Sequence, residues 1–489
     1  MSVMRTKSIE QSIADTDEPE YQLKKTLTAL DLTVFGVGVI IGAGIFTLTG
    51  RAASTLAGPA IVLSFVISAV ACGLAALCYA EFASSVPVSG SAYTFSYASL
   101  GEIIAWIIGW DLLLELMLGA SVVAQGWSTY AVVFLGNIGI PWPEAIGPGG
   151  RVDVLAMLLV AVLATLVTIG IKESMRVNMV LVGVKLFVVL FVIFAGIGFI
   201  NPANYNPFIP PTTPTEAGAE AWYLQPLIQA VLGWEPSAFG IGGIFAGAAL
   251  VFFAYIGFDV VATTAEEAKN PQRDLPIGIM ASLAVCTVLY ILMAMVMTGL
   301  VPFPQLDVAE PVYVALDAAG PQLAWLKYLT TVGAVAGLAS VVLVMLMAQP
   351  RIFYAMSRDG LLPPIFGRVH PKYQTPWLAT IITGGCAAVV AGLLPIGLLG
   401  QLVSIGTLFA FVIVCAGILV LRYTKPDLKR PFRTPFVPFV PLAGIGICAY
   451  LMYSLPSDTW WRLAIWMGIG LLIYAFYGRH NSKLANSGG

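Results

Sequence analysis

The chain has 489 residues, of which 24 are Lys or Arg and 26 are Asp or Glu, so its formal net charge is −2. Only 10% of the residues are charged and 58% are hydrophobic, whereas soluble domains carry about 25% charged residues. So few charges could not cover the surface of a water-soluble globule, and the near-neutral balance offers no electrostatic footprint for DNA or RNA. These values exclude a cytosolic enzyme and a nucleic-acid-binding protein, and they predict an integral membrane protein.

Apolar runs recur along the whole chain. A membrane-spanning helix needs about 20 mostly apolar residues, and the runs are continuous and rich in glycine, unlike the alternating segments of a transmembrane β-barrel. In chain order they cover residues 28–50, 57–82, 101–135, 152–171, 177–200, 239–265, 275–300, 328–356, 377–394, 397–421, 437–455 and 459–478. We therefore predict an all-α membrane protein with twelve transmembrane helices.

The polar segments between these runs predict the orientation. If the N-terminal segment 1–27 is cytoplasmic and the twelve spans alternate, 19 of the 24 Lys and Arg residues fall on the cytoplasmic side and 4 on the outside. The long segment 201–238, which contains no Lys or Arg, then becomes an external loop. Because cytoplasmic loops of membrane proteins are enriched in Lys and Arg, both termini are predicted to be cytoplasmic and the protein to reside in the cell membrane.

The order of the spans repeats once. The first five runs form the segment 28–200, and the next five, in the segment 239–421, follow the same order of lengths. Since five is odd, the second set enters the membrane from the opposite side, which is typical of secondary transporters built from inverted repeats. Two accessory helices in 422–478 and a cytoplasmic tail, 479–489, complete the predicted organisation.

The first span of each repeat contains an interruption. Span 1 carries glycines at 36, 38, 42 and 44, and span 6 carries the stretch FFAYIG at 252–257. Glycine weakens a helix by about 1 kcal/mol relative to alanine, and a broken helix in lipid is tolerated only where it lines a cavity or binds something. The exposed N–H groups and carbonyls suit the carboxylate and ammonium of an amino acid. Close packing of helices through small residues is the alternative explanation for the glycines.

Several stretches carry a family resemblance. They are GVGVIIGAGIFTLTGRAA at 36–53, AGPAIVLSF at 57–65, ALCYAEFASSVPVSGSAYTFSYASLGE at 76–102, FFAYIGFD at 252–259 and TTAEEAKNPQRDLPIGI at 263–279. The chain resembles the amino acid–polyamine–organocation superfamily and, within it, bacterial members of the cationic amino acid transporter family. The resemblance implies a leucine-transporter-type fold, with a 5+5 inverted repeat, broken spans 1 and 6 and two accessory helices.

The resemblance also implies a substrate site at the two breaks. The substrate carboxylate would meet the amides of Ala43, Gly44 and Ile45, and the amino group would meet the carbonyls of Ile40, Phe253 and Ile256. An aromatic ring at position 252 or 253 would close the site as a gate. The full set of expected substrate-binding residues is Ile40, Gly42, Ala43, Gly44, Ile45, Phe252, Phe253, Ala254 and Ile256.

Two ionisable residues lie well inside apolar runs and are functional candidates for that reason. They are Lys185 in span 5 and Glu115 in span 3. In the resembling proton-coupled transporters a lysine in span 5 takes the place that a sodium ion occupies between spans 1 and 8 of sodium-driven relatives. Lys185 would therefore couple transport to protons, and Glu115 would relay or stabilise the charge. The alternatives are a snorkelling lysine and a structural carboxylate.

A set of charged residues near the inner ends of spans 6 and 8 allows two interpretations. The charges either anchor the ends of the spans in solvent or exchange partners as an inner gate opens. The residues are Glu266, Glu267, Arg273, Arg351, Arg358 and Asp359.

The predicted function is that of a proton-coupled symporter that imports L-amino acids and is not an enzyme. Because spans 6 and 8 offer mainly apolar side chains (Phe252, Met345 and Met347), small neutral substrates such as alanine, with broad specificity, are favoured. Transport of cationic amino acids (arginine, lysine or ornithine) is the alternative, and an amino-acid sensor on the same fold is the second. We expect a monomer with amino acid, proton and membrane lipid as its partners, and no cofactor, metal or nucleic acid.

Overall fold

The computed structural model describes residues 5–7, 25–88, 90–214, 227–232, 237–308, 310–323, 325–373 and 375–486. Each of the twelve predicted apolar runs contains helix in this structure. The main helices are α2 (Ala29–Ile40), α4 (Ile61–Ser85), α6 (Glu102–Asn137), α7 (Val154–Ile169), α8 (Ile171–Ile197), α10 (Gly240–Val251), α11 (Pro271–Leu300), α13 (Leu326–Arg358), α14 (Trp377–Leu393), α15 (Ile396–Thr424), α16 (Phe439–Tyr453) and α17 (Ser457–Ile473). Within the described ranges, 8 helical stretches are long and apolar enough to cross a membrane, beside shorter apolar helices such as α7, α14 and α16.

Several short elements join these helices. The helical ones are α3 (Thr49–Ala52), α5 (Ala92–Ser99), α9 (Leu227–Leu232), α12 (Pro311–Ala318), α18 (Arg479–Asn481) and α19 (Lys483–Asn486). Within the predicted external loop, β1 (Thr213–Pro214) pairs antiparallel with β2 (Ser237–Ala238), with Thr213 opposite Ala238. Most of the predicted N-terminal segment, and the middle of that loop, lie outside the described residues.

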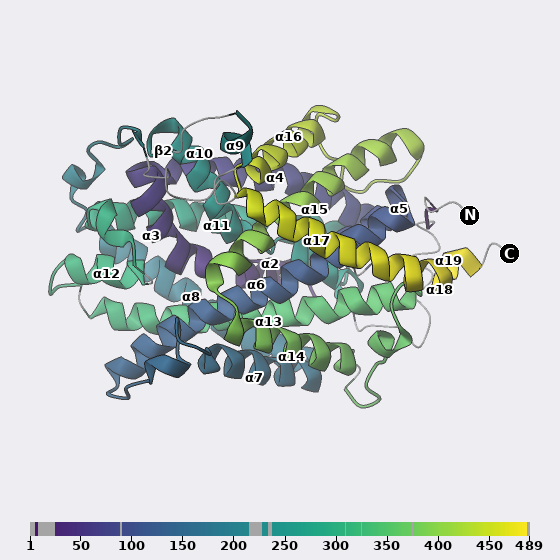
Figure 1. The fold of residues 1–489 in the computed structure, drawn as a ribbon, viewed down its shortest axis with the longest axis horizontal. Helices are drawn as coiled ribbons and strands as arrows, with labels where there is room; N and C mark the ends of the chain where they lie inside the picture. The colour runs from purple at the N-terminus through teal and green to yellow at the C-terminus, as the bar shows by residue number, and fades with distance from the viewer. Residues whose placement is uncertain are drawn as a thin grey trace.

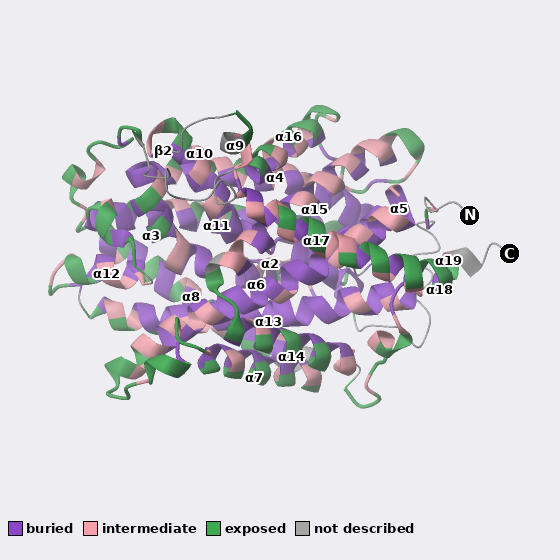
Figure 2. Cartoon of the chain, viewed as in Figure 1, coloured by how far each residue is buried: buried purple, intermediate pink, exposed green. Residues whose placement is uncertain are grey.

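The long helices run side by side along the long axis of the molecule (Figure 1). α6 packs along α13, α4 packs along α11, and α7 packs along α14. Burial is concentrated on the central helices, whereas α7, α14 and α17 present exposed faces (Figure 2). Large apolar side chains lie on the outside, among them Phe194 and Ile241, which are 72% and 71% exposed. An all-helical bundle with an apolar exterior is a multi-span membrane protein, because such a surface is stable only in lipid.

Both ends of the described chain meet at one end of the bundle, where Figure 1 marks the termini. The amide of Glu102 donates to the carbonyl of Arg5 at 2.8 Å. The hydroxyl of Ser482 donates to the carboxylate of the same Glu102 at 2.6 Å. We refer to this end as the terminal end.

The first span is longer than the run 28–50 that the sequence suggested. After its break it continues through a π-helical turn (Gly44–Leu48), α3 and a second π-helical turn (Ala53–Ala57). Gly58, with φ of 62°, and Pro59 then turn the chain into α4. The apolar run stops before Arg51, but the side chain of this residue is exposed, so the helix continues past it with little loss of solvation for the charge.

Candidate functional site

The first break lies where the glycine pattern predicted it, in residues 41–44. α2 ends at Ile40, and Ile41 has an extended backbone, with ψ of 100°. The helix resumes around Ala43 and continues as the π-helical turn Gly44–Leu48. Backbone carbonyls at the end of α2 and N–H groups at the start of the second half thus lose their helical partners.

The second break lies within residues 252–258. α10 ends at Val251 and is followed by a 3₁₀ turn, Phe252–Tyr255, and by Ile256, whose ψ of 133° is extended. Gly257 has φ of 123°, and a second 3₁₀ segment runs over Asp259–Glu267. The interruption expected in span 6 is therefore confirmed.

The two breaks touch each other. A Cβ atom added to Gly44 would lie 2.1 Å from the Cβ and 2.5 Å from the Cα of Ala254. A Cβ added to Gly42 would lie 2.7 Å from a methyl of Val341 on α13. The glycines of span 1 therefore let its broken segment approach both the broken segment of span 6 and α13.

The expected substrate-binding residues are all buried at this contact. Ala43 and Gly44 lie at the start of the second half of span 1, where N–H groups lack helical partners. Two expected backbone groups are already bonded within the protein. The amide of Ile45 donates to the carbonyl of Gly42 at 3.2 Å, and the carbonyl of Phe253 accepts the amide of Ile256 at 3.3 Å.

The carbonyl of Ile40, expected to meet the substrate amino group, also has a protein partner. It accepts a hydrogen bond from the hydroxyl of Tyr290 on α11, at 2.5 Å. The same hydroxyl lies 2.8 Å from the carbonyl of Ala254. Sequence reasoning missed Tyr290, although a tyrosine in the apolar run 286–297 is a polar signal that could have drawn attention to it.

The two candidate gate rings have different surroundings. Phe252 is fully buried, and its ring lies 5.8 Å from that of Phe411, in an edge-on arrangement. Phe253 is 7% exposed, and no ring contact is found for it in the described part of the chain. Both side chains therefore belong to the packed core, and Phe253 is the slightly more exposed of the two.

Lys185 reaches the break of span 1 from α8. Its ammonium donates to the carbonyls of Gly38 at 2.6 Å and Ile41 at 2.8 Å, and to the hydroxyl of Ser340 on α13 at 2.7 Å. The three donors of an ammonium group are thus matched by three acceptors. Lys185 is 0% exposed, so its side chain does not snorkel to the surface.

Glu115, which was expected to relay or stabilise the charge, is not among the three groups bonded to the Lys185 ammonium. It lies beside Thr407 of α15 and within electrostatic reach of Asp111 and Asp259. Both oxygens of Asp111 lack a hydrogen-bond partner among the described residues. Asp111, Glu115 and Asp259 thus form a cluster of three buried acids.

Ion pairs connect the terminal ends of spans 6 and 8. Arg351 of α13 lies 2.7 Å from Glu267, and Arg358 lies 3.6 Å from Glu266. Asp359 pairs with Lys7 at 2.6 Å and accepts the hydroxyl of Tyr93 at 2.7 Å. These charges are buried in pairs and do not anchor span ends in solvent; Arg273, by contrast, is exposed.

Breaking one of these pairs should destabilise the protein. The side chains of Glu267 and Arg351 are only 5% and 6% exposed, so Glu267→Gln or Arg351→Gln leaves a buried charge unpaired, at a cost of about 3–5 kcal/mol. The double variant should recover part of this loss. The midpoints of thermal unfolding in detergent measure this loss of stability. Asp317→Asn is the control, because the side chain of Asp317 is 53% exposed in its pair with Lys327. Equal midpoints for Glu267→Gln and Asp317→Asn would contradict the prediction.

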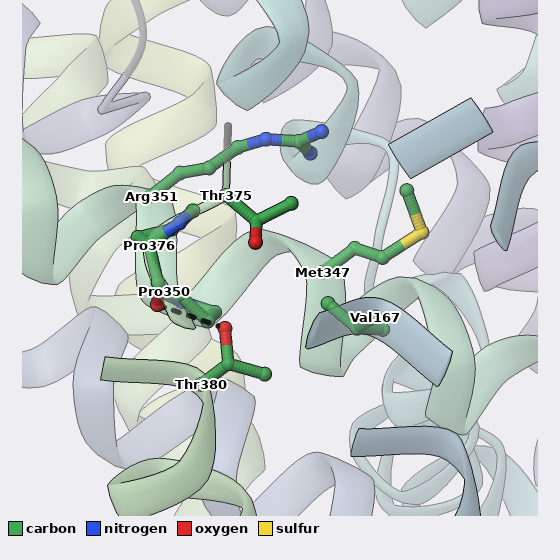
Figure 3. A pocket seen from close by; sticks show the side chains of 7 residues that line it. All are labelled: Val167, Met347, Pro350, Arg351, Thr375, Pro376 and Thr380. Carbon is green, nitrogen blue, oxygen red and sulfur yellow. Dashed lines mark hydrogen bonds between the residues drawn. The ribbon is translucent and has the colours of Figure 1, made fainter. Parts of the chain in front are cut away.

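A small hollow lies away from the two breaks, between α7, α13 and the start of α14 (Figure 3). It is lined by Val167, Met347, Pro350, Arg351, Thr375, Pro376 and Thr380. The guanidinium of Arg351 extends from this region to its partner, Glu267. The hollow therefore borders the ion pairs of the terminal end and not the expected substrate site.

Comparison with known proteins identifies the class. The sequence model of the Amino acid permease family matches residues 27–478. Since this match covers nearly the whole chain, the protein belongs to the amino acid permease family, in the amino acid–polyamine–organocation superfamily, and is a transporter and not an enzyme.

Proteins similar to this chain are named for different substrates. The chain is 43% identical over 489 residues to the methylthioribose transporter of Bacillus subtilis, covering 99% of each chain. It is 46% identical over 492 residues to the branched-chain amino acid permease of the same organism, again covering 99% of each. A vacuolar cationic amino acid transporter 4 of Arabidopsis thaliana is 33% identical over 614 residues, covering 99% of this chain and 97% of the relative.

Proposed function

We propose that this protein is a proton-coupled symporter that imports neutral L-amino acids across the cell membrane. The observation that carries the proposal is the bonding of the Lys185 ammonium to the carbonyls of Gly38 and Ile41, where span 1 breaks. Loss of one proton removes the charge that holds this segment to α8 and α13. A proton thereby acts as a ligand that favours one conformation of the broken span, as coupling requires.

We further propose twelve spans in a 5+5 inverted repeat with both termini in the cytoplasm. The lengths of corresponding helices support it. α4 and α11 have 25 and 30 residues, α6 and α13 have 36 and 33, and α7 and α14 have 16 and 17. Each of these helices packs against its counterpart, as expected if the repeats cross around a shared axis.

In this proposal the two breaks recognise the groups that all amino acids share. The amides of Ala43 and Gly44 receive the carboxylate, because helix N-termini favour anions, and carbonyls of the broken ends receive the ammonium. Apolar side chains nearby, including Phe253 and Val341, favour aliphatic substrates such as alanine. The branched-chain amino acid permease among the relatives supports a neutral substrate.

Cationic amino acids remain the second candidate for one specific reason. Asp111, Glu115 and Asp259 form a buried acidic cluster behind the break of span 6, and none forms an ion pair among the described residues. An arginine or lysine side chain that reached this cluster would find a partner for its charge. The relative named for cationic amino acids supports this alternative. A sensor on the same fold would bind the same ligands without moving them.

Uptake into liposomes that contain only this protein tests the proposal. Labelled L-alanine should accumulate when the outside is more acidic than the inside, without sodium, and L-leucine should compete more strongly than L-arginine. Much stronger competition by arginine would favour the cationic alternative. Saturable binding without uptake would favour the sensor, and competition by methylthioribose but by no amino acid would overturn amino acid transport.

A further inference from the structure

We infer that Tyr290 of α11 is a positioning residue that builds the receptor for the substrate ammonium by holding the two broken spans together. This inference rests on the proposed function, since it assigns a role to a residue of the same site. Its starting point is the unusual place of one hydroxyl group, between the carbonyl of Ile40 at 2.5 Å and that of Ala254 at 2.8 Å. Ile40 ends the first half of span 1, and Ala254 lies in the broken turn of span 6.

A phenol carries one donor hydrogen, so Tyr290 can donate to only one of the two carbonyls at a time. The other carbonyl lies within reach of the same oxygen but receives no hydrogen from it. An unsatisfied carbonyl buried in a membrane protein is costly, and an ammonium with three donors satisfies it. The hydroxyl therefore leaves one acceptor open for a cationic donor beside it.

The packing of the Tyr290 ring fixes its hydroxyl between the two carbonyls. It is fully buried and packs against Phe65 of α4, with ring centroids 5.4 Å apart, and against Tyr255, with centroids 5.3 Å apart. Tyr255 belongs to the broken turn, and its own hydroxyl donates to the carbonyl of Phe65 at 3.0 Å. The broken turn, α4 and α11 thus form one packed unit around the phenol.

Two carbonyl dipoles that point at one place repel each other. The hydroxyl between Ile40 and Ala254 reduces this repulsion, because its single hydrogen binds one of the two carbonyl oxygens at a time. Without it, the carbonyls turn apart, and an amino acid must bring them together again when it binds. Preorganisation of this kind strengthens binding because the cost of ordering is already met before the ligand arrives.

Tyr290→Phe tests this role, because the substitution removes one oxygen and keeps the packed ring. In proteoliposomes under an inward proton gradient, the KM for L-leucine and for L-alanine should rise about tenfold, while the maximal rate stays within about twofold of the wild type. Tyr79→Phe is the matched control. Tyr79 is also fully buried among aromatic rings, but its hydroxyl lacks a hydrogen-bond partner among the described residues. The KM of Tyr79→Phe should equal that of the wild type.

Binding of L-leucine to the purified protein in detergent provides the second measurement, and thermal unfolding shows whether both variants are folded. A KM or a binding constant equal to that of Tyr79→Phe would overturn the inference. Tighter binding by Tyr290→Phe would also overturn it, because the hydroxyl would then compete with the ammonium. A folded Tyr290→Phe variant with a lower maximal rate and an unchanged KM would overturn it as well. If the wild type itself neither binds nor takes up amino acids, the proposed function fails, and that result is distinct from a failure of the variant alone.

Discussion

Lys185→Ala is expected to reduce concentrative amino acid uptake driven by a pH gradient to the level of liposomes without protein. The substitution removes three hydrogen bonds from a buried ammonium, to Gly38, Ile41 and Ser340. Hydrogen bonds from charged donors contribute about 1.5–3 kcal/mol each. The broken end of span 1 then loses its connection to α8 and α13 through this side chain, and with it the ammonium whose charge changes with protonation.

The measurement is uptake of labelled alanine at a fixed inside pH while the outside pH is lowered. Wild-type uptake should rise as the outside becomes more acidic and should be independent of sodium, whereas the variant should show no response. Lys372→Ala serves as the control, because Lys372 is exposed at the surface. Sodium-dependent, pH-insensitive uptake in the wild type, or full proton-driven activity in Lys185→Ala, would show that Lys185 has only a structural role.

Gly44→Ala is expected to abolish transport while leaving most of the fold intact. The added methyl would lie 2.1 Å from the Cβ and 2.5 Å from the Cα of Ala254. Backbone atoms cannot rotate away as a flexible side chain can, so the two breaks must separate. Insertion of a methyl group into a packed core costs about 1–3 kcal/mol, and here the strain falls directly on the proposed substrate site.

Gly126→Ala in α6 is the matched control, since a Cβ at Gly126 would meet nothing within 4 Å. Alanine favours helix over glycine by about 1 kcal/mol, so this variant should transport normally and be no less stable. Binding and uptake of alanine by both variants, with thermal unfolding alongside, check the prediction. Wild-type uptake by Gly44→Ala would mean that the two breaks do not need their close contact.

Much of the architecture could be predicted from local sequence. Composition and continuous apolar runs depend on the thickness of the bilayer and on hydrogen bonding within each helix, which are properties of single segments. The glycines at 42 and 44 indicated the first break for the same local reason. Predicted ends were less accurate, as Arg51 shows, because a long cationic side chain can lie exposed beside a helix that continues past it.

The candidate site could be predicted only in part. The position of Lys185 within an apolar run followed from the sequence, but its three acceptors lie on α2, at Ile41 in the break that follows it, and on α13, far away along the chain. The bonding of Lys185 to groups other than Glu115, and the grouping of Glu115 with Asp111 and Asp259, depend on how α6, α8 and the 3₁₀ segment Asp259–Glu267 meet. Sequence spacing within one helix cannot determine this, because it sets a face but not the partner of that face.

The sequence by itself thus determined the class of protein, the helical segments, the positions of both breaks and the intramembrane charges. Only the tertiary structure decided what those groups contact: Tyr290 between the carbonyls of Ile40 and Ala254, Gly44 against Ala254, and Arg351 with Glu267. The physical reason is that some of these effects act within one segment of the chain and others act only between segments. Hydropathy, glycine and charge act on the segment that carries them, whereas a hydrogen bond or a steric contact exists only when two distant segments are brought within a few ångströms.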